Sequence, residues 1–164
     1  MKHSSKTRLR SRRGNAMLEF GLASLILIPL FVGTFQFGYT FYVYNLLSNQ
    51  VRAGARYASM RTFRCKDDDG ITAFKNKVKN VVVYGNPAPA GGATSLVPGL
   101  TTARVDVQIK GQNDLDASKT NIPAYVTVSS LNFPLDAVFR TYTFNGKPVL
   151  RFPYSGQYAP GESE

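Results

Sequence analysis

The stretch Arg12–Phe20 reads Arg-Arg-Gly-Asn-Ala-Met-Leu-Glu-Phe, and it marks the point where a basic segment gives way to an apolar one. Residues 1–14 contain six Lys or Arg residues and no acid. The run Phe20–Val51 then contains 32 residues without Asp, Glu, Lys, Arg or His. A helix of this length extends about 48 Å at roughly 1.5 Å per residue, whereas the hydrocarbon core of a membrane is about 30 Å thick. The sequence therefore predicts a helix over residues 15–61 that spans a membrane at about residues 20–40 and continues beyond it as a rod.

The positive charge of the chain is concentrated at its beginning. The formal net charge is +10, yet the part that follows Arg61 carries 11 basic and 9 acidic residues. Basic residues ahead of an apolar helix stay on the cytoplasmic side of a membrane. Residues 1–14 are therefore predicted to be a basic cytoplasmic leader, and the C-terminal part is predicted to cross. The basicity is then a topology signal, and we expect no nucleic acid among the partners.

Two other targeting signals fit the same region less well. A cleaved secretory signal needs a shorter apolar core, followed by a cleavage site with small residues. A twin-arginine signal is suggested by Ser11–Arg13, but it leaves the acid at Glu19 without an explanation. We therefore expect an anchor at this position.

Glu19 is the unusual residue at the start of the apolar run. A carboxylate beside a membrane helix is costly unless it is paired, so it is a candidate functional residue. Two other interpretations stay open, because Glu19 can lie at the level of the lipid headgroups or interact favourably with a helix N-terminus.

The order of features around Glu19 resembles a type IV prepilin signal, with a basic leader, Gly14, an acid five residues later, an aromatic residue and an apolar helix. In that family a membrane peptidase cleaves after the glycine, where the absence of a side chain lets it grip extended backbone. The new N-terminus is often methylated, and the acid helps to seat the subunit against its neighbour. The resemblance implies cleavage between Gly14 and Asn15, a seating role for Glu19 and Phe20, and an α-amine one helical turn from the carboxylate.

A narrower resemblance, to the TadE family of the tight-adherence or Flp-type pilus system, covers about residues 12–60. Its elements, in order, are Glu19-Phe20-Gly21-Leu22, Ile28-Pro29-Leu30, Gly33-Thr34-Phe35-Gln36-Phe37-Gly38, Tyr42-Val43-Tyr44 and Val51-Arg52-Ala53-Gly54-Ala55-Arg56-Tyr57-Ala58. Many relatives carry an acid where this chain has Gln36. The resemblance implies a pseudopilin: a minor or accessory subunit of pilus assembly in the bacterial inner membrane, with a periplasmic domain, or on the pilus or cell surface. The implied partners are membrane lipid, the prepilin peptidase and other pilin or assembly subunits.

Two further features of the predicted helix have both structural and functional interpretations. Pro29 removes one backbone hydrogen bond, so it is either a tolerated membrane proline or a flexible kink that lets the helix repack in a filament. Beyond the membrane, a face with small residues is predicted to pack on the chain's own domain, on neighbouring subunits, or on both. That packing face consists of Val51, Gly54, Ala55 and Ala58.

Residues 62–160 are predicted to form a small extracytoplasmic domain, so the fold class is α+β with a pilin-like arrangement. Helical periodicity predicts a helix that starts near Ile71 and ends near Gly85, and alternation predicts strands at residues 103–110 and 125–129. Asn145-Gly146 predicts a hairpin between strands at residues 138–144 and 148–152. The chain is expected to fray from Pro153 onward.

The sequence gives little support for catalysis, so we expect no enzyme, no cofactor and no metal site. The one histidine, His3, lies in the leader, and the single cysteine, Cys65, has no partner for an internal disulfide. Asp67–Gly70 resembles a calcium loop, but it lacks the alternating oxygen ligands of one. The main alternative to a pilus subunit is an unprocessed, membrane-tethered periplasmic binding domain.

Overall fold

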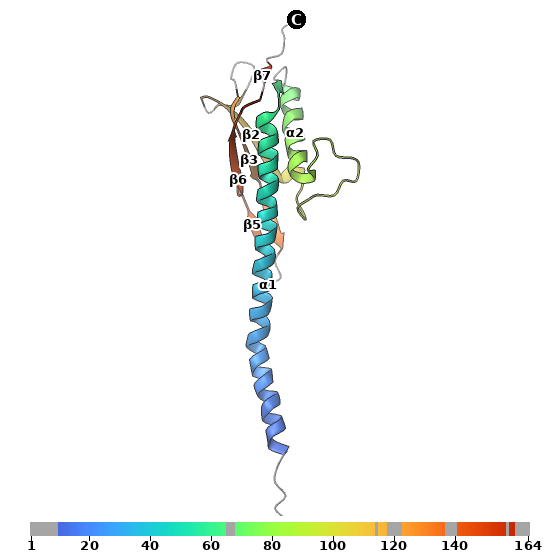
Figure 1. Ribbon diagram of the computed structural model, residues 1–164, viewed down its shortest axis with the longest axis vertical. Coiled ribbons are helices and arrows are strands. Elements are labelled where there is room, and N and C mark those ends of the chain that lie inside the picture. The colour runs from blue at the N-terminus through green and yellow to red at the C-terminus, as the bar shows by residue number, and fades with distance from the viewer. Residues whose placement is uncertain are drawn as a thin grey trace, which may run out of the picture. The chain divides into compact units, whose positions relative to one another are not determined.

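The computed structural model describes residues 10–64, 68–113, 115–117, 123–136, 141–156 and 158–159, and it has a long N-terminal helix and a small, mostly antiparallel sheet domain (Figure 1). This arrangement confirms the predicted α+β fold class. The chain divides into two compact units, Met1–Tyr39 and Thr40–Glu164. The predicted leader lies mostly outside the described residues, as does Cys65.

The first helix, α1, runs from Arg10 to Met60 and contributes to both units. Its first part, residues 14–39, contains five Leu residues, which favour a helix, but also four Gly residues and Pro29, which do not. Between residues 14 and 39 nearly every side chain is exposed, including Met17 at 82% and Phe35 at 78%. This part of α1 has apolar residues on all its sides, as expected of a helix that another apolar medium covers.

The second part of α1 is amphipathic and supplies one wall of the core of the second unit. Its buried side chains recur at intervals of three or four residues, which places them on one face of a helix. They are Val43, Leu47, Val51, Ala55 and Ala58. The opposite face carries exposed polar residues such as Asn49 and Arg52.

The helix α2, Asp68–Tyr84, packs on this face of α1. Its side chains Val78 and Val82 are fully buried in the core. The ring of Phe74 makes an edge-to-face contact with the ring of Phe63, and their centroids are 5.4 Å apart. Gly85 ends the helix in the left-handed conformation, with φ +72°, and its N–H donates to the carbonyl of Val81 at 2.9 Å. The predicted helix and its end at Gly85 are thus confirmed.

The main sheet has three antiparallel strands in the order β2-β3-β6, with β2 at Val105–Gly111, β3 at Pro123–Ser130 and β6 at Val149–Pro153. Burial alternates along β2 and along most of β3, so that one face contributes to the core and the other does not. The core residues from these two strands are Val105, Val107, Ile109, Val126 and Val128. The strands predicted at 103–110 and 125–129 are confirmed within a few residues. A single 3-10 turn, η1 at Thr102–Arg104, precedes β2.

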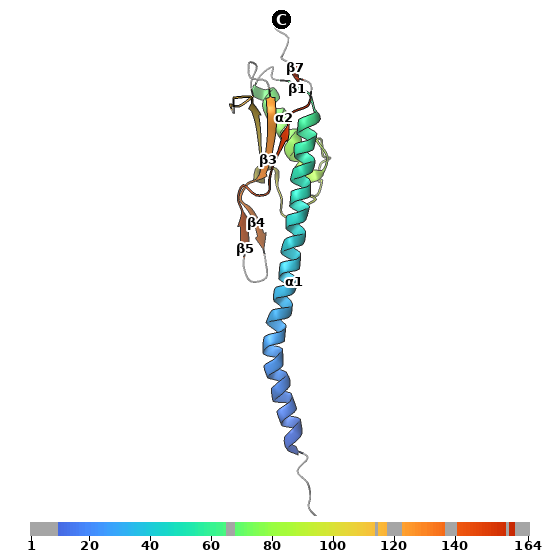
Figure 2. The ribbon, with the colours of Figure 1, turned by 60° about the vertical axis from the view of Figure 1, so that its left-hand side comes forward.

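The predicted hairpin around Asn145-Gly146 is wrong, because the two flanking strands lie in different sheets. β5, at Thr141–Phe144, pairs with β4, at Phe133–Asp136, whereas β6 pairs with β3. Figure 2 shows β4 and β5 as a separate pair. The chain does bend at Asn145-Gly146, where Gly146 has φ +68°, and the Gly146 N–H donates to the carbonyl of Ser130 at 2.8 Å.

Tertiary packing explains why the turn signal did not produce a hairpin. Phe144, at the end of β5, packs on Tyr44 of α1 with ring centroids 5.4 Å apart. Leu150 and Phe152 of β6 pack against the core when β6 pairs with β3. Pairing β5 with β6 would give up one of these contacts, so the chain crosses between sheets at the turn.

The prediction of fraying from Pro153 is wrong for the described residues 153–156 and 158–159. The Tyr154 hydroxyl accepts a hydrogen bond from the Phe63 N–H at 2.8 Å and donates one to the Arg61 carbonyl at 2.6 Å. The N–H of Ser155 donates to the carbonyl of Ser59 at 2.9 Å. The strand β7, Tyr158–Ala159, pairs in parallel with β1, Phe63–Arg64. These bonds hold the C-terminal segment against the end of α1.

At Gly54 the backbone of α1 lies close to Val82 of α2, and we predict that Gly54→Ala destabilises the second unit. An added Cβ would lie 2.2 Å from Cγ2 of Val82, a buried and β-branched side chain with little rotamer freedom. Overpacking of this kind costs about 1–3 kcal/mol, which exceeds the gain of up to about 1 kcal/mol from replacing a helical glycine. Thermal unfolding of the detergent-solubilised chain, followed by circular dichroism, measures the effect. Gly38→Ala is the matched control, since a Cβ there meets nothing within 4 Å. Equal melting temperatures for the two variants would contradict the prediction.

Candidate functional site

The structure places the proposed cleavage site inside a helix. Gly14 and Asn15 lie in the second turn of α1, which begins at Arg10, and both are exposed. The sequence predicted an extended backbone for a peptidase to grip, so cleavage here requires the first turns of α1 to unwind. A glycine makes unwinding easier by about 0.5–1 kcal/mol relative to alanine. No packing contact requires Gly14, because an added Cβ would meet nothing within 4 Å.

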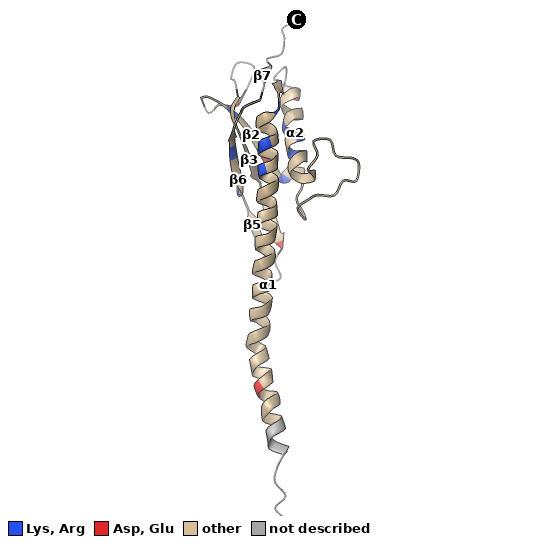
Figure 3. Ribbon diagram, in the orientation of Figure 1, with Lys and Arg blue, Asp and Glu red and all other residues tan. Residues whose placement is uncertain are grey.

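Glu19 and Phe20 lie exposed on α1, one turn beyond Asn15. Residues four apart on a helix are surface neighbours, so the Glu19 side chain lies next to position 15. Glu19 is also the one charged residue between positions 14 and 51. Figure 3 shows this part of the helix as a tan ribbon with one red band. A single carboxylate therefore stands on an otherwise uncharged surface.

Exposed apolar side chains surround Glu19 along the first unit. α1 is long and apolar enough from Gly14 onward to cross a membrane, by length and composition. Within its most apolar window none of the residues is buried. Fully burying one large aliphatic side chain is worth about 1.5–3 kcal/mol. Many such side chains, including Leu25 and Phe35, are available to drive this helix into lipid or against other helices.

Pro29 lies within α1, which stays helical on both sides of it. Proline has no N–H to donate, so the carbonyl of Leu25 loses its helical partner. In the turn after the proline, the hydroxyl of Thr34 donates a hydrogen bond to the carbonyl of Leu30 at 2.9 Å. A side-chain bond of this kind adds to the backbone hydrogen bonds of the helix. The helix is thus locally weakened at Pro29 without being broken.

The predicted packing face is occupied within the second unit. Val51, Ala55 and Ala58 are fully buried, and Gly54 faces Val78 and Val82 of α2. These small residues let the two helices approach closely. The contacts with neighbouring subunits that the sequence also allowed would therefore have to use another face of this helix.

The described residues contain no group of three or more His, Cys, Asp or Glu side chains that could hold a metal ion. The groups that the site presents are the carboxylate of Glu19 and the exposed apolar side chains around it.

Comparison with protein families gives one match, to the model described as TadE-like protein, over residues 14–56. Residues 14–56 are TadE-like. The match begins at Gly14 and includes Glu19, Phe20, Pro29 and most of the packing face. It confirms the TadE resemblance recognised from the sequence, and the TadE family is that of the tight-adherence (Tad) pilus system. One apolar helix near the N-terminus fits a membrane anchor in such a system. No curated protein and no solved structure matches the chain.

The TadE-like segment gives a prediction about Pro29. In Pro29→Ala the new N–H can donate to the Leu25 carbonyl, so the weakened turn should become a regular one. Amide hydrogen exchange of the full chain in micelles should slow about tenfold or more at residues 26–33, since proline in a helix interior costs about 3 kcal/mol. Amides around Gly54 serve as the internal control and should exchange as before. Unchanged exchange around position 29 would show that the proline does not weaken the helix.

Proposed function

We propose that this chain is a non-enzymatic, TadE-like membrane protein that acts as a minor or accessory subunit in the assembly of a tight-adherence pilus. The helix at about residues 20–40 anchors the protein in the bacterial inner membrane. The N-terminus lies in the cytoplasm, and the domain of residues 62–160 lies in the periplasm. The observation that carries the proposal is the part of α1 between Gly14, where the TadE match begins, and Tyr39. It is apolar on all sides and exposed, and it has a single acid five residues after Gly14.

The carboxylate of Glu19 gives this anchor a means of engaging a neighbour. Burying one unpaired charge in an apolar environment costs several kcal/mol, and pairing with an opposite charge offsets much of that cost. Cleavage after Gly14 by the prepilin peptidase would place an α-amine on Asn15, one turn from Glu19. A neighbouring subunit's amine could take the same position. The acid thus favours association of processed helices within the membrane, with Phe20 beside it on the exposed surface.

The weakened turn at Pro29 serves the same step. A subunit that leaves the bilayer must repack its helix against protein in place of lipid. A helix with one missing hydrogen bond bends at lower cost, because there is less backbone hydrogen bonding to lose.

A second candidate function is an unprocessed membrane-tethered periplasmic binding domain. The observation that favours it is the helical backbone at Gly14 and Asn15, which a peptidase must first unwind. The two functions differ in whether this bond is cut.

We predict that the protein isolated from its native membrane begins at Asn15. Intact mass and N-terminal peptide sequencing measure the first residue directly. Gly14→Ala should keep the leader, because peptidase recognition and not packing selects glycine here. Gly21→Ala is the matched control: it is also a helical glycine with open space around it, and processing should continue.

Two outcomes of this experiment would contradict the prediction, and a third variant tests the role of Glu19. A chain that begins at Met1 in the wild type would overturn the processing step and favour the tethered domain. Equal processing of the two glycine variants would show that Gly14 does not specify the cut. If the wild type is cut at Asn15, Glu19→Gln should still be cut but should be reduced about tenfold or more in the pilus-associated fraction, as the loss of one buried charge pair implies. Unchanged association of that variant would remove the seating role of Glu19.

A further inference from the structure

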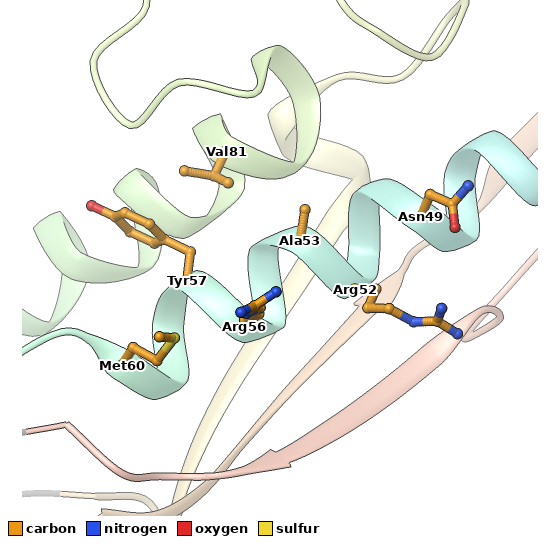
Figure 4. Close-up of a pocket in the computed structure, with 7 residues that line it drawn as sticks. All are labelled: Asn49, Arg52, Ala53, Arg56, Tyr57, Met60 and Val81. Carbon is orange, nitrogen blue, oxygen red and sulfur yellow. The ribbon is translucent and has the colours of Figure 1, made fainter.

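A shallow groove of about 520 Å³ lies along the open side of the second half of α1 (Figure 4). We call it the arginine groove; its lining comes from α1 between Asn49 and Met60 and from Val81 of α2. Figure 4 shows Ala53 and Tyr57 on the side of α1 that faces α2, and Arg52 on the side away from it. All of these residues belong to the second unit.

Two arginines give the groove its charge. Arg52 and Arg56 are one helical turn apart and both are exposed, so the two side chains leave α1 from neighbouring positions on its surface. Within the described residues, neither guanidinium takes part in an ion pair, and no acid lines the groove. Lys77 of α2 is exposed and precedes Val81 by one helical turn, which adds a third cation on the same side of α2. The surface therefore carries positive charge that nothing in the described chain neutralises.

The floor of the groove is apolar. Met60 is 58% exposed, and the ring of Tyr57 is half-buried with the guanidinium of Arg61 at 5.0 Å from its centroid. Ala53 is exposed between the two arginines in the chain and leaves the backbone open to close approach. Arginine and aromatic side chains around an apolar floor are the composition typical of protein interfaces.

The position of the groove disfavours lipid headgroups as the ligand, if the membrane ends near residue 40 as proposed above. Arg52 lies 12 residues beyond Thr40, which is about 18 Å along a helix. Electrostatic attraction to a charged surface is largely screened beyond about 8–10 Å at physiological ionic strength. A protein segment that carries carboxylates can approach the arginines directly, so this screening distance does not exclude it.

We propose that the arginine groove is the docking site for an acidic segment of another protein. In the docked state, two carboxylates about one helical turn apart pair with Arg52 and Arg56, and an apolar side chain lies against Ala53 and Tyr57. Arginine suits this role because its planar fork binds carboxylates through two hydrogen bonds at once. The proposal concerns a face of α1 that the core leaves open and does not depend on cleavage at Gly14.

A photo-crosslinking amino acid at position 53, in the full chain in its native cells, tests the proposal. We expect an adduct with one other protein, and mass spectrometry should find at least two Asp or Glu residues within one turn of the cross-linked site. Arg52→Glu should lower the adduct yield about tenfold, because it replaces an attraction with a repulsion. Lys147→Glu is the matched control: it reverses one exposed charge outside the groove and should leave the yield unchanged. Because Arg52 is exposed, the variant should fold; if it does not, washing wild-type membranes with 1 M salt before irradiation should lower the yield instead.

Several results would overturn the proposal. These are the absence of an adduct, an adduct with lipid, nucleic acid or a second copy of this chain, and an adduct with a protein segment that lacks acids. A yield that neither Arg52→Glu nor 1 M salt reduces would overturn it as well. Processing at Gly14 is measured separately by mass. A negative cross-linking result would therefore leave the proposed function standing, and a chain that is not cut at Gly14 would leave the proposed docking site standing.

Discussion

The constraint on which the rest of this structure depends is that one helix must satisfy two different environments. From Gly14 to about Tyr39 the side chains of α1 are apolar on every side and exposed, which is unstable in water. From Thr40 onward the same helix has one buried apolar face and one polar face. α1 is a continuous helix from Arg10 to Met60, so the two units differ along it only in the side chains that they carry.

The domain is built on the amphipathic part of that helix. Small residues around Gly54 let α2 approach α1 closely, and the sheet β2-β3-β6 supplies alternating valines and isoleucine to the same core. The C-terminal segment then returns to the end of α1, where Tyr154 bonds to the backbone of Arg61 and Phe63. Because the core face of α1 is buried within the chain, the proposed contacts with other proteins use the apolar surface before residue 40 and the arginine groove.

Local signals in the sequence predicted those parts of the fold that local physics decides. The uncharged run, the 3.6-residue periodicity of α2 and the alternation of β2 each identified an element, and ordered motifs between Gly14 and Ala58 identified the TadE-like segment. The Asn145-Gly146 turn and the expected fraying after Pro153 misled, because their outcome depends on contacts distant in sequence, such as Phe144 with Tyr44 and Tyr154 with Phe63. The arginine groove was likewise missed. Arg52 and Arg56 stand four residues apart in the sequence, but no sequence signal placed Val81 beside them.

The most direct test of the account is the accessibility of single cysteines to a membrane-impermeant maleimide, in native membranes and in a Cys65→Ser background. The account predicts that Leu27→Cys stays unlabelled until detergent is added, whereas Asn49→Cys is labelled from the periplasmic side alone. Labelling of both positions at similar rates in intact membranes would contradict it, because the apolar part of α1 would then lie in water or in an open protein surface and not in the bilayer.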